Sequence, residues 1–285
     1  MLDVSVIVCA RNAEFNIEAC LESIRENNPR EIILVDGHSS DRTVEIAEKY
    51  TTSILYDPGR GLAVARNIGI DHANAKYQCF VGPDNIMPPD SISKCISYLE
   101  ENDYAGVSVV TFIKNPRQGY FAQALNFYKK ARFYPGERDI IGTPYVFKAE
   151  ILKKFRFDPM FTNSDDTDLC MRLSDNGFKV GISDVIVYEA GFENLSSINE
   201  RWSRYGKGDF LFYSKYSPNW GIKRKIYSFS HPLRDELVFP FIKALPRQKF
   251  LLLPFLILIT SIRYISWFRH WVSQWFQTQS PMKQS

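Results

Sequence analysis

The sequence predicts an α/β protein with a mainly parallel sheet, and three observations support this prediction. In the first half of the chain, short apolar runs alternate with stretches of helical periodicity, as in βαβ units. Each apolar run ends abruptly in a turn rich in Gly, Pro, Asp or Asn. The chain has 285 residues, 45% hydrophobic and 24% charged, which is enough for one large domain or two smaller ones.

Four apolar runs are expected to be strands of this sheet. They are Val4–Cys9, Ile32–Val35, Ser53–Tyr56 and Tyr77–Val81. A helical stretch lies in each interval, with apolar positions at Ile17, Leu21 and Ile24, at Val44, Ile46 and Ala47, and, after Gly61, at Ala65, Ile68 and Ile70. Crossover helices between parallel strands pack on the faces of the sheet, which predicts a doubly wound layer.

A polar side chain follows each of these strands. The four residues are Asn12, Asp36, Asp57 and Asp84. In a parallel sheet they share one edge, where open α/β sheets bind their ligands. Asp36 is placed to bind a ribose or a base edge, and Asp84 offers an oxygen ligand to Mg²⁺ or Mn²⁺. Each residue alone fits a turn or a helix cap equally well, but their joint placement favours a nucleotide site.

Two further segments add polar groups to this edge. Arg66 and Asn67 lie one helical turn beyond Gly61 and are expected to reach a diphosphate; the alternative is a surface charge and a cap. Asp165 and Asp166 begin a predicted helix, in which Asp168 can pair with Arg172. Acidic residues at a helix start complement its dipole, but a carboxylate there can also accept a proton from a hydroxyl nucleophile.

The aromatic middle segment, Tyr104 to Lys153, allows two interpretations. It is expected to be helical from Phe121 to Phe133, and basic residues lie among its aromatic ones. Sugar stacking or a membrane-facing groove would use such a surface, and core packing explains it equally well.

Charge and cysteine content limit the classes of partner. A net charge of +3 gives no indication of a nucleic-acid partner. The positive charge is concentrated between Arg201 and Lys249, where eleven Lys and Arg face three acidic residues, and such a belt beside apolar sequence suggests an anionic membrane surface or a solvated basic face. The five cysteines have neither metal nor redox spacing, which favours buried free thiols in a reducing compartment.

The C-terminal apolar stretch predicts a membrane anchor. Phe250 to Ile262 is too short to span a bilayer, and Pro254 and Arg263 are expected to interrupt and end it. Trp267, Trp271 and Trp275 follow at helical spacing, which suggests a monotopic anchor in the headgroup region. The alternatives are a core helix, a partner-binding helix or a tilted span. We therefore expect a domain over residues 1–200 and a basic, helical, membrane-associating region over residues 201–285.

Five stretches together resemble glycosyltransferase family 2, the inverting transferases of the GT-A type. They are Val4–Asn12, Ile33–Asp41, Gly61–Gly69, Phe80–Asn85 and Asp165–Arg172, in family order. The resemblance implies a Rossmann-like mixed sheet, a UDP- or GDP-sugar donor and a metal, Mg²⁺ or Mn²⁺. It implies that Asp166 is the catalytic base. It implies donor-binding roles for Ala10, Arg11, Asn12, Asp36, Arg66, Asn67, Asp84 and Asp165.

The resemblance also has a looser part and two departures. Arg204-Tyr205-Gly206-Lys207-Gly208 is similar to the basic segment that closes over the diphosphate, which assigns Arg204 and Lys207 to the donor. Gly82 stands where the family usually has an acidic residue, so Asp84 is left with Asn85 as its partner for the metal. Asp165 replaces the usual Glu of the pair, while the base position is kept.

Three functions follow for testing. The first is transfer of a sugar to a hydroxyl of a glycan or lipid-linked glycan at the cytoplasmic face of the membrane. The second is transfer to a polyprenyl phosphate, which is already anionic and needs no base, so Asp166 argues against it. The third is non-catalytic nucleotide-sugar binding, suggested by Gly82. The helix N-terminus is expected to lower the pKa of Asp166, and burial would oppose this.

Overall fold

The structure is a computed structural model of the whole chain, and it describes residues 1–115, 119–190, 194–244 and 246–279. These residues divide into two compact units. Unit 1 consists of Met1–Pro116 and Phe133–Gly191, and unit 2 of Arg117–Arg132 and Phe192–Ser285.

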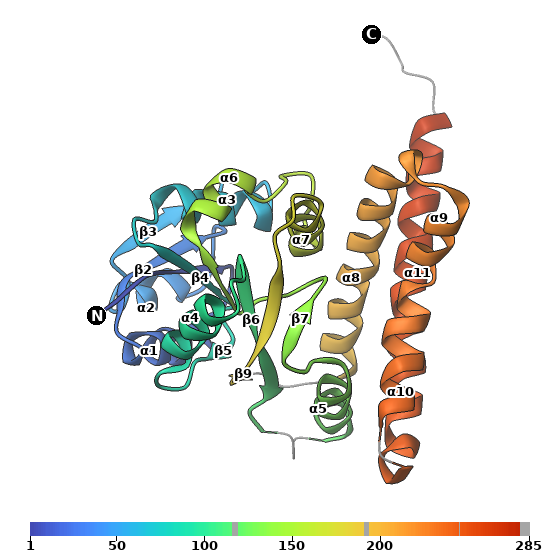
Figure 1. Cartoon of the computed structure of the whole chain (residues 1–285), viewed down its shortest axis with the longest axis horizontal. Coiled ribbons are helices and arrows are strands. Elements are labelled where there is room, and N and C mark those ends of the chain that lie inside the picture. The colour runs from blue at the N-terminus through green and yellow to red at the C-terminus, as the bar shows by residue number, and fades with distance from the viewer. Residues whose placement is uncertain (116–118, 191–193, 245, 280–285) are drawn as a thin grey trace. The chain divides into compact units, whose positions relative to one another are not determined.

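Unit 1 is a mixed nine-stranded sheet with helices on both faces (Figure 1). Its strands are β1 (Leu2–Ala10), β2 (Pro29–Asp36), β3 (Ser53–Tyr56), β4 (Tyr77–Val81), β5 (Asn85–Ile86), β6 (Gly106–Ile113), β7 (Gly136–Arg138), β8 (Tyr145–Lys148) and β9 (Val180–Glu189). Its helices are α1 (Ile17–Glu26), α2 (Thr43–Ala47), α3 (Leu62–His72), α4 (Ser91–Glu101), α6 (Ala149–Phe155) and α7 (Asp165–Asp175).

The strand order is β3-β2-β1-β4-β8-β6-β9-β5, with β7 paired to β9. β1 to β4 are mutually parallel, whereas β8 runs antiparallel to both β4 and β6. The predicted α/β class and the mixed sheet are therefore confirmed. The expected strands Ser53–Tyr56 and Tyr77–Val81 match β3 and β4 residue for residue.

Two apolar clusters fill the space between the sheet and its helices. Val4, Val6 and Val8 of β1 pack in one cluster with α1, α2 and α4. Ile7 of the same strand packs in the other cluster, with α3, α6 and α7. The strand is thus buried on both faces, as near-continuous apolar runs in parallel sheets are.

Unit 2 is helical. Its elements are α5 (Tyr120–Arg132), α8 (Leu195–Tyr216), the 3₁₀ turn η1 (Ser217–Asn219), α9 (Ile222–Phe229), the π-helix η2 (Pro232–Val238), α10 (Phe239–Lys243) and α11 (Pro246–Gln279). Trp202 of α8, Tyr128 of α5 and Phe255 of α11 meet edge to face in its core, with ring centroids 5.8 to 6.3 Å apart.

The structure differs from two expectations about this half of the chain. α5 belongs to unit 2, because Tyr128 packs on Trp202 and Phe255, and the boundary expected at residue 200 falls inside α8. α11 continues through Pro254 and Arg263, so neither residue ends the apolar helix. Helices tolerate an internal proline when packing compensates for the lost hydrogen bond, and here Phe255 and Leu256 are fully buried.

Candidate active site

The carboxyl ends of β1, β2 and β4 lie side by side at one edge of the sheet. Ala10 is opposite Asp36 in the β1–β2 register, and Val8 is opposite Val81 in the β1–β4 register. The residues that follow these strands therefore share this edge, which we call the site edge. Ala10, Asn12, Asp36 and Asp84 are placed there as the parallel arrangement predicts.

Hydrogen bonds tie together the two loops that follow β1 and β2. The Asp36 carboxylate, almost completely buried, accepts from the Ser39 N–H at 2.9 Å and from the Ser39 hydroxyl at 2.6 Å. The same hydroxyl accepts from the Asn12 N–H at 2.9 Å, and Asn12 Oδ1 accepts from the Ser40 N–H at 2.9 Å. Arg11 is exposed, with its side chain lying against Gly37. These contacts bring Arg11, Asn12 and Asp36 into one preorganised loop pair.

The turn after β4 is built around Gly82. Its N–H donates to Asn85 Oδ1 at 2.9 Å, and its carbonyl accepts from the Asn85 N–H at 3.0 Å. A Cβ at position 82 would lie 2.9 Å from both Asn85 Oδ1 and Asp84 Oδ1, closer than side chains tolerate. A larger residue at position 82 would therefore require the ends of the Asp84 and Asn85 side chains to shift. Asn85 is buried, and its side-chain oxygen holds the turn by accepting from the Gly82 N–H, so its role as a metal ligand stays a prediction.

Arg66 is buried and its guanidinium is already engaged. It donates to Asp165 Oδ2 at 2.5 Å and to the Thr143 hydroxyl at 2.7 Å. Burial alone would lower the pKa of Arg66, but the negative charge of Asp165 more than offsets it, and the pKa rises above its ordinary value. Arg66 therefore forms a buried ion pair, which also engages the carboxylate of Asp165, and its diphosphate role stays a prediction.

Asn67 is likewise used within the fold. Its amide N–H donates to the Phe157 carbonyl at 2.8 Å, and its oxygen accepts from the Phe157 N–H at 3.0 Å. The side chain is buried, and this pair of bonds fastens α3 to the loop after α6. We therefore give Asn67 no donor-binding role below.

Asp166 lies in the first turn of α7, directly after the buried Asp165. Its Oδ1 accepts from the Thr167 N–H at 2.8 Å, and its Oδ2 lies 3.5 Å from the place of a Cβ on Gly142. Burial, and then the negative charge of Asp165, raise the pKa of Asp166 to about 6 despite the opposing Arg66 charge. Backbone hydrogen bonds at the helix N-terminus lower this pKa, as expected, but burial, the opposing effect, outweighs them. A half-buried carboxylate with this pKa is suited to accept a proton near neutral pH.

The rest of α7 is fixed to the fold by the predicted pair. The Arg172 Nε donates to Asp168 Oδ2 at 2.8 Å, and its Nη atoms donate to the carbonyls of Phe155 and Arg156. Asp168 is fully buried. The pair therefore anchors the helix and leaves Asp166 as the acidic residue of its first turn that neither Arg66 nor Arg172 neutralises directly.

Comparison with known families accounts for this arrangement. Residues 5–160, more than half of the chain, match the family model described as Glycosyl transferase family 2. The chain belongs to this family. Residues 83–276 also match the model described as Glycosyl transferase family group 2, so similarity extends through α11.

A curated relative of this family 2 chain is the amylovoran biosynthesis glycosyltransferase AmsB of Erwinia amylovora. The two are 27% identical over 195 residues, which is 61% of this chain and 65% of AmsB. Another relative, the putative glycosyltransferase EpsH of Bacillus subtilis, is 34% identical over 94 residues. That match covers 30% of this chain and 27% of EpsH, so these relatives extend well beyond the matched parts.

Solved structures show the same fold. A mannosyltransferase from Pyrobaculum calidifontis, in complex with GDP-Man and Mn²⁺, matches 92% of this chain and 87% of its own with a TM-score of 0.63 and 18% identity. S. aureus TarS 1-349 in complex with UDP-GlcNAc matches 98% and 93%, with a TM-score of 0.54 and 16% identity. These similarities confirm the GT-A nucleotide-sugar transferase fold.

The family 2 site contains residues that the sequence did not indicate. Three rings, Phe80, Tyr145 and Phe157, surround the Arg66 guanidinium at 5.9, 5.6 and 5.1 Å from its central carbon. Thr143 accepts a hydrogen bond from Arg66, and Ser108 Oγ donates to the carbonyl of Gly142 at 2.5 Å. Phe80 begins one of the recognised stretches, but its packing on Arg66 has no local signal, and Ser108, Thr143, Tyr145 and Phe157 lie outside those stretches.

Two of the predicted donor-binding residues of this family 2 chain belong to unit 2. Arg204 and Lys207 lie inside α8 of unit 2, where Arg204 is exposed and faces Glu200 at 3.9 Å, and their donor role stays a prediction.

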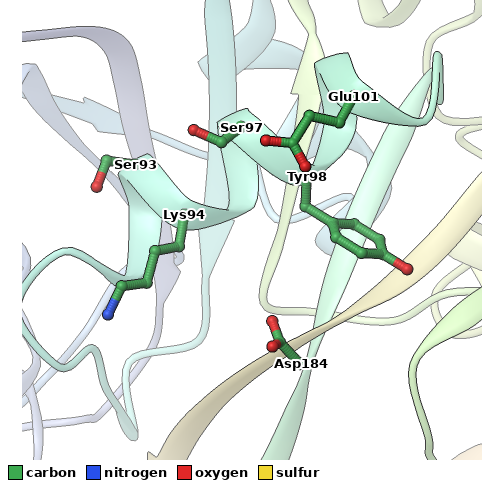
Figure 2. Close-up of a pocket in the computed structure, with 6 residues that line it drawn as sticks. All are labelled: Ser93, Lys94, Ser97, Tyr98, Glu101 and Asp184. Carbon is green, nitrogen blue, oxygen red and sulfur yellow. The ribbon is translucent and has the colours of Figure 1, made fainter.

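A pocket of about 380 Å³ lies in unit 1, lined by residues of α4 and by Asp184 of β9 (Figure 2). None of the predicted site residues lines it, so we do not place the donor there.

Proposed function

We propose that this chain transfers a sugar from a UDP- or GDP-sugar to a hydroxyl of a glycan or lipid-linked glycan, with inversion at the anomeric carbon. The observation that carries the proposal is Asp166, a carboxylate with a pKa of about 6 held beside the Arg66–Asp165 pair. Family membership and the nucleotide sugars named in the TarS and mannosyltransferase complexes support the donor class. The name of AmsB supports a role in cell-envelope polysaccharide biosynthesis.

The donor is assigned to the site edge. Ala10, Arg11, Asn12 and Asp36 would hold the nucleoside, since the two loops are already tied together and need little ordering on binding. Asp36 retains acceptor capacity beyond its two bonds from Ser39, because a carboxylate has about four lone-pair sites. A ribose or base donor group can therefore bind to it.

A metal at Asp84 fits the residues present. Among the described residues, no group of three or more His, Cys, Asp or Glu is arranged to hold a metal. Mg²⁺, and by the same chemistry Mn²⁺, is commonly bound by one or two carboxylates together with substrate phosphates, which one half-buried Asp84 satisfies. When bound, the metal would neutralise charge that develops on the departing nucleoside diphosphate.

The side chains of the chain itself would perform the proton transfer. The acceptor hydroxyl attacks the anomeric carbon, its proton passes to the Asp166 carboxylate, and the electron pair of the breaking bond leaves with the diphosphate. Arg66 holds Asp165, and Asp165 keeps Asp166 basic enough to act. We call Arg66 and Asp165 positioning residues, because they reach the acceptor only through Asp166.

We also propose that the protein works at the cytoplasmic face of the cell membrane, as a peripheral or monotopic protein. The support is the apolar surface of unit 2, where Ile222, Ile242 and Phe250 are 72%, 64% and 91% exposed. A lipid-linked acceptor would be available there.

The test compares two substitutions on α7 in the full chain. Asp166→Asn is expected to reduce kcat by about 10²–10⁴ while a nucleotide sugar with Mn²⁺ still raises the thermal midpoint. Asp175→Asn, the same chemical change at the exposed C-terminal end of the helix, is the matched control and should retain activity. Because folding raises the pKa of Asp166, its charge destabilises the folded state at pH 7, so the Asn variant should be at least as stable.

Three outcomes would reject the proposal. Unchanged turnover of Asp166→Asn with a polyprenyl phosphate acceptor would assign the chain to that reaction instead. Donor binding with no turnover under any acceptor or metal would indicate a binding protein. If a nucleotide sugar with Mn²⁺ still raises the thermal midpoint of Asp84→Ala, the metal does not bind at Asp84.

A further inference from the structure

Helix α11 is apolar on two opposite faces, and only one of them is buried. Leu252, Phe255, Leu256 and Ile259 are fully buried in the core of unit 2. The opposite face forms an exposed stripe with members three, four or eight residues apart. Phe250, Leu253, Ile257, Ile265, Phe268, Val272 and Phe276 make up this stripe, each between 37% and 91% exposed.

Helix α9 is a cationic amphipathic helix. Ile222, Ile226 and Phe229 share one face by their spacing and are 72%, 61% and 38% exposed. Lys223, Arg224 and Lys225 occupy the remaining positions of the first turns, and the helix contains no acidic residue. Such a helix, with apolar and basic faces, is typical of segments that lie in a membrane interface.

The apolar faces of the two helices are continuous. The rings of Phe229 and Phe268 are 5.9 Å apart between centroids, and the Tyr264 hydroxyl donates to the Phe229 carbonyl at 2.9 Å. Beyond this junction, Trp271 and Trp275 of α11 are each 50% exposed. The basic residues of α9 therefore border an apolar surface that ends in exposed indoles.

Charge complementarity identifies the occupant of this surface. An apolar face bordered by Lys and Arg, with Trp at one end, matches an anionic bilayer, whose headgroups attract the basic residues and whose interface accommodates indole rings. A protein partner would need a surface of matching acidic and apolar character.

α11 also has a feature that keeps it from crossing the bilayer. Phe250–Phe276 is long and apolar enough to span a membrane, but half of its apolar 18-residue stretch is buried within the protein. At its centre, Arg263 donates to both Asp209 oxygens, at 2.5 and 2.8 Å, and to Glu236 at 2.5 Å. The close approach of Gly206 to the Arg263 carbonyl fixes the helix against α8. A spanning α11 would have to abandon these partners in hydrocarbon.

We propose that α9 and the exposed stripe of α11 form one surface that lies in the plane of an anionic bilayer, with α11 not crossing it. This inference deepens the membrane association proposed above and does not depend on the sugar-transfer chemistry. It assigns α9 the electrostatic part of binding and α11 the apolar part.

The test is flotation of the full-length protein with phosphatidylcholine vesicles containing, or lacking, phosphatidylglycerol. Binding is expected with the anionic vesicles only, and added salt should weaken it. Replacing Lys223, Arg224 and Lys225 by Gln should reduce partitioning on the order of a hundredfold, because each basic residue contributes roughly fivefold. Lys94, Lys153 and Lys154 of unit 1, replaced by Gln together, are the charge-matched control and should leave binding unchanged. Phe268→Gln removes an apolar side chain from the exposed stripe of α11 and should also weaken binding to the vesicles that contain phosphatidylglycerol.

The orientation is tested with Lys243→Cys and Gln274→Cys on sealed vesicles and a membrane-impermeant maleimide, with the wild-type protein giving the background. Both sites are expected to react from outside, whereas protection of one site would show that α11 spans. Binding that ignores lipid charge or the α9 substitutions would overturn the proposal. The proposal would also be overturned if the protein formed a dimer that Phe268→Gln dissociates and that does not bind vesicles. Turnover with a soluble acceptor, measured on the same samples, separates failure of the chemistry from failure of the docking surface.

Discussion

Each unit of this protein buries an arginine beside carboxylates, and the two arginines serve different purposes. In unit 1, Arg66 pairs with Asp165, and the adjacent Asp166 has its pKa raised to about 6. In unit 2, Arg263 pairs with Asp209 and Glu236, and Glu236 also accepts from the Tyr128 hydroxyl at 2.6 Å and the Trp202 indole at 3.2 Å.

The difference lies in how completely each set of carboxylates is neutralised. Burial alone would raise the pKa of Glu236, but the positive charges of Arg132 and Arg263 lower it to about 2. Unit 2 thus keeps Glu236 ionised down to about pH 2, and its ion pairs connect α8, η2 and α11. Unit 1 leaves one carboxylate incompletely compensated, which costs stability and, in the reaction proposed above, would supply the base. The two clusters therefore differ in their balance of charge, which is complete around Glu236 and incomplete around Asp166.

Arg66 offers the strongest way to break this distinction. Arg66→Met leaves Asp165 buried without its cation, which should destabilise unit 1 by about 3–5 kcal/mol and raise the pKa of Asp166 further. Arg66→Lys keeps the charge but not the two-partner geometry and should cost less. The measurements are the thermal midpoint and the pH profile of kcat/KM. The acid limb of this profile should move to higher pH for Arg66→Met but not for Arg66→Lys. If both variants shift the acid limb equally, Arg66 acts through its shape rather than its charge.

Arg263→Met probes the cluster of unit 2. It leaves Glu236 and Asp209 without their main cation, and a loss of about 3–5 kcal/mol in the free energy of unfolding is expected from denaturant titration. Arg269→Met, on the same helix but exposed, is the control and should change it by less than about 0.5 kcal/mol. Equal effects from the two substitutions would mean that the buried ion pairs do not hold α11 in place.

The smallest expected effect, and the sharpest contrast, is in pH dependence. Asp166 must be ionised to act as the proposed base, so kcat/KM should fall about tenfold per unit as the pH drops below about 6. Glu236 has a lowered pKa, so the stability it provides is present above its ordinary pKa of 4.5 and is lost as the pH falls toward 2. At pH 5 the protein should therefore be folded and largely inactive. Activity and near-ultraviolet circular dichroism measured across pH 2–8 would show one common transition if this separation were wrong.

Local patterns in the sequence predicted those parts of unit 1 that depend on neighbours along the chain. Ser53–Tyr56 and Tyr77–Val81 are bounded by turn residues, and their ends were found for that reason. The Asp168–Arg172 pair follows from helical spacing alone. The common edge of Asp36 and Asp84 follows from parallel topology, which alternating strands and helices already imply.

Other features depend on contacts that local patterns do not encode. Arg66 and Asp165 are 99 positions apart, so nothing near Arg66 shows that its charge is already used. The aromatic residues of α5 indicate burial but not which core they join. In α11 both faces are apolar, and Arg263 at its centre pairs with Asp209 and Glu236, which lie outside the helix. The pKa of Asp166 had two opposing causes, and only the packing decided between them.

Gly206 of α8 illustrates how a packing residue can be mistaken for a binding one. A methyl group there would lie 2.2 Å from the main-chain oxygen of Arg263, so alanine would act as a wedge between the two helices. Gly206 stands between Arg204 and Lys207. A genetic screen that recovered inactive or temperature-sensitive alleles at position 206 would therefore appear to identify a phosphate-binding loop. Such alleles would instead report the helix–helix spacing, and second-site suppressors should arise at small residues of α11 such as Ser266.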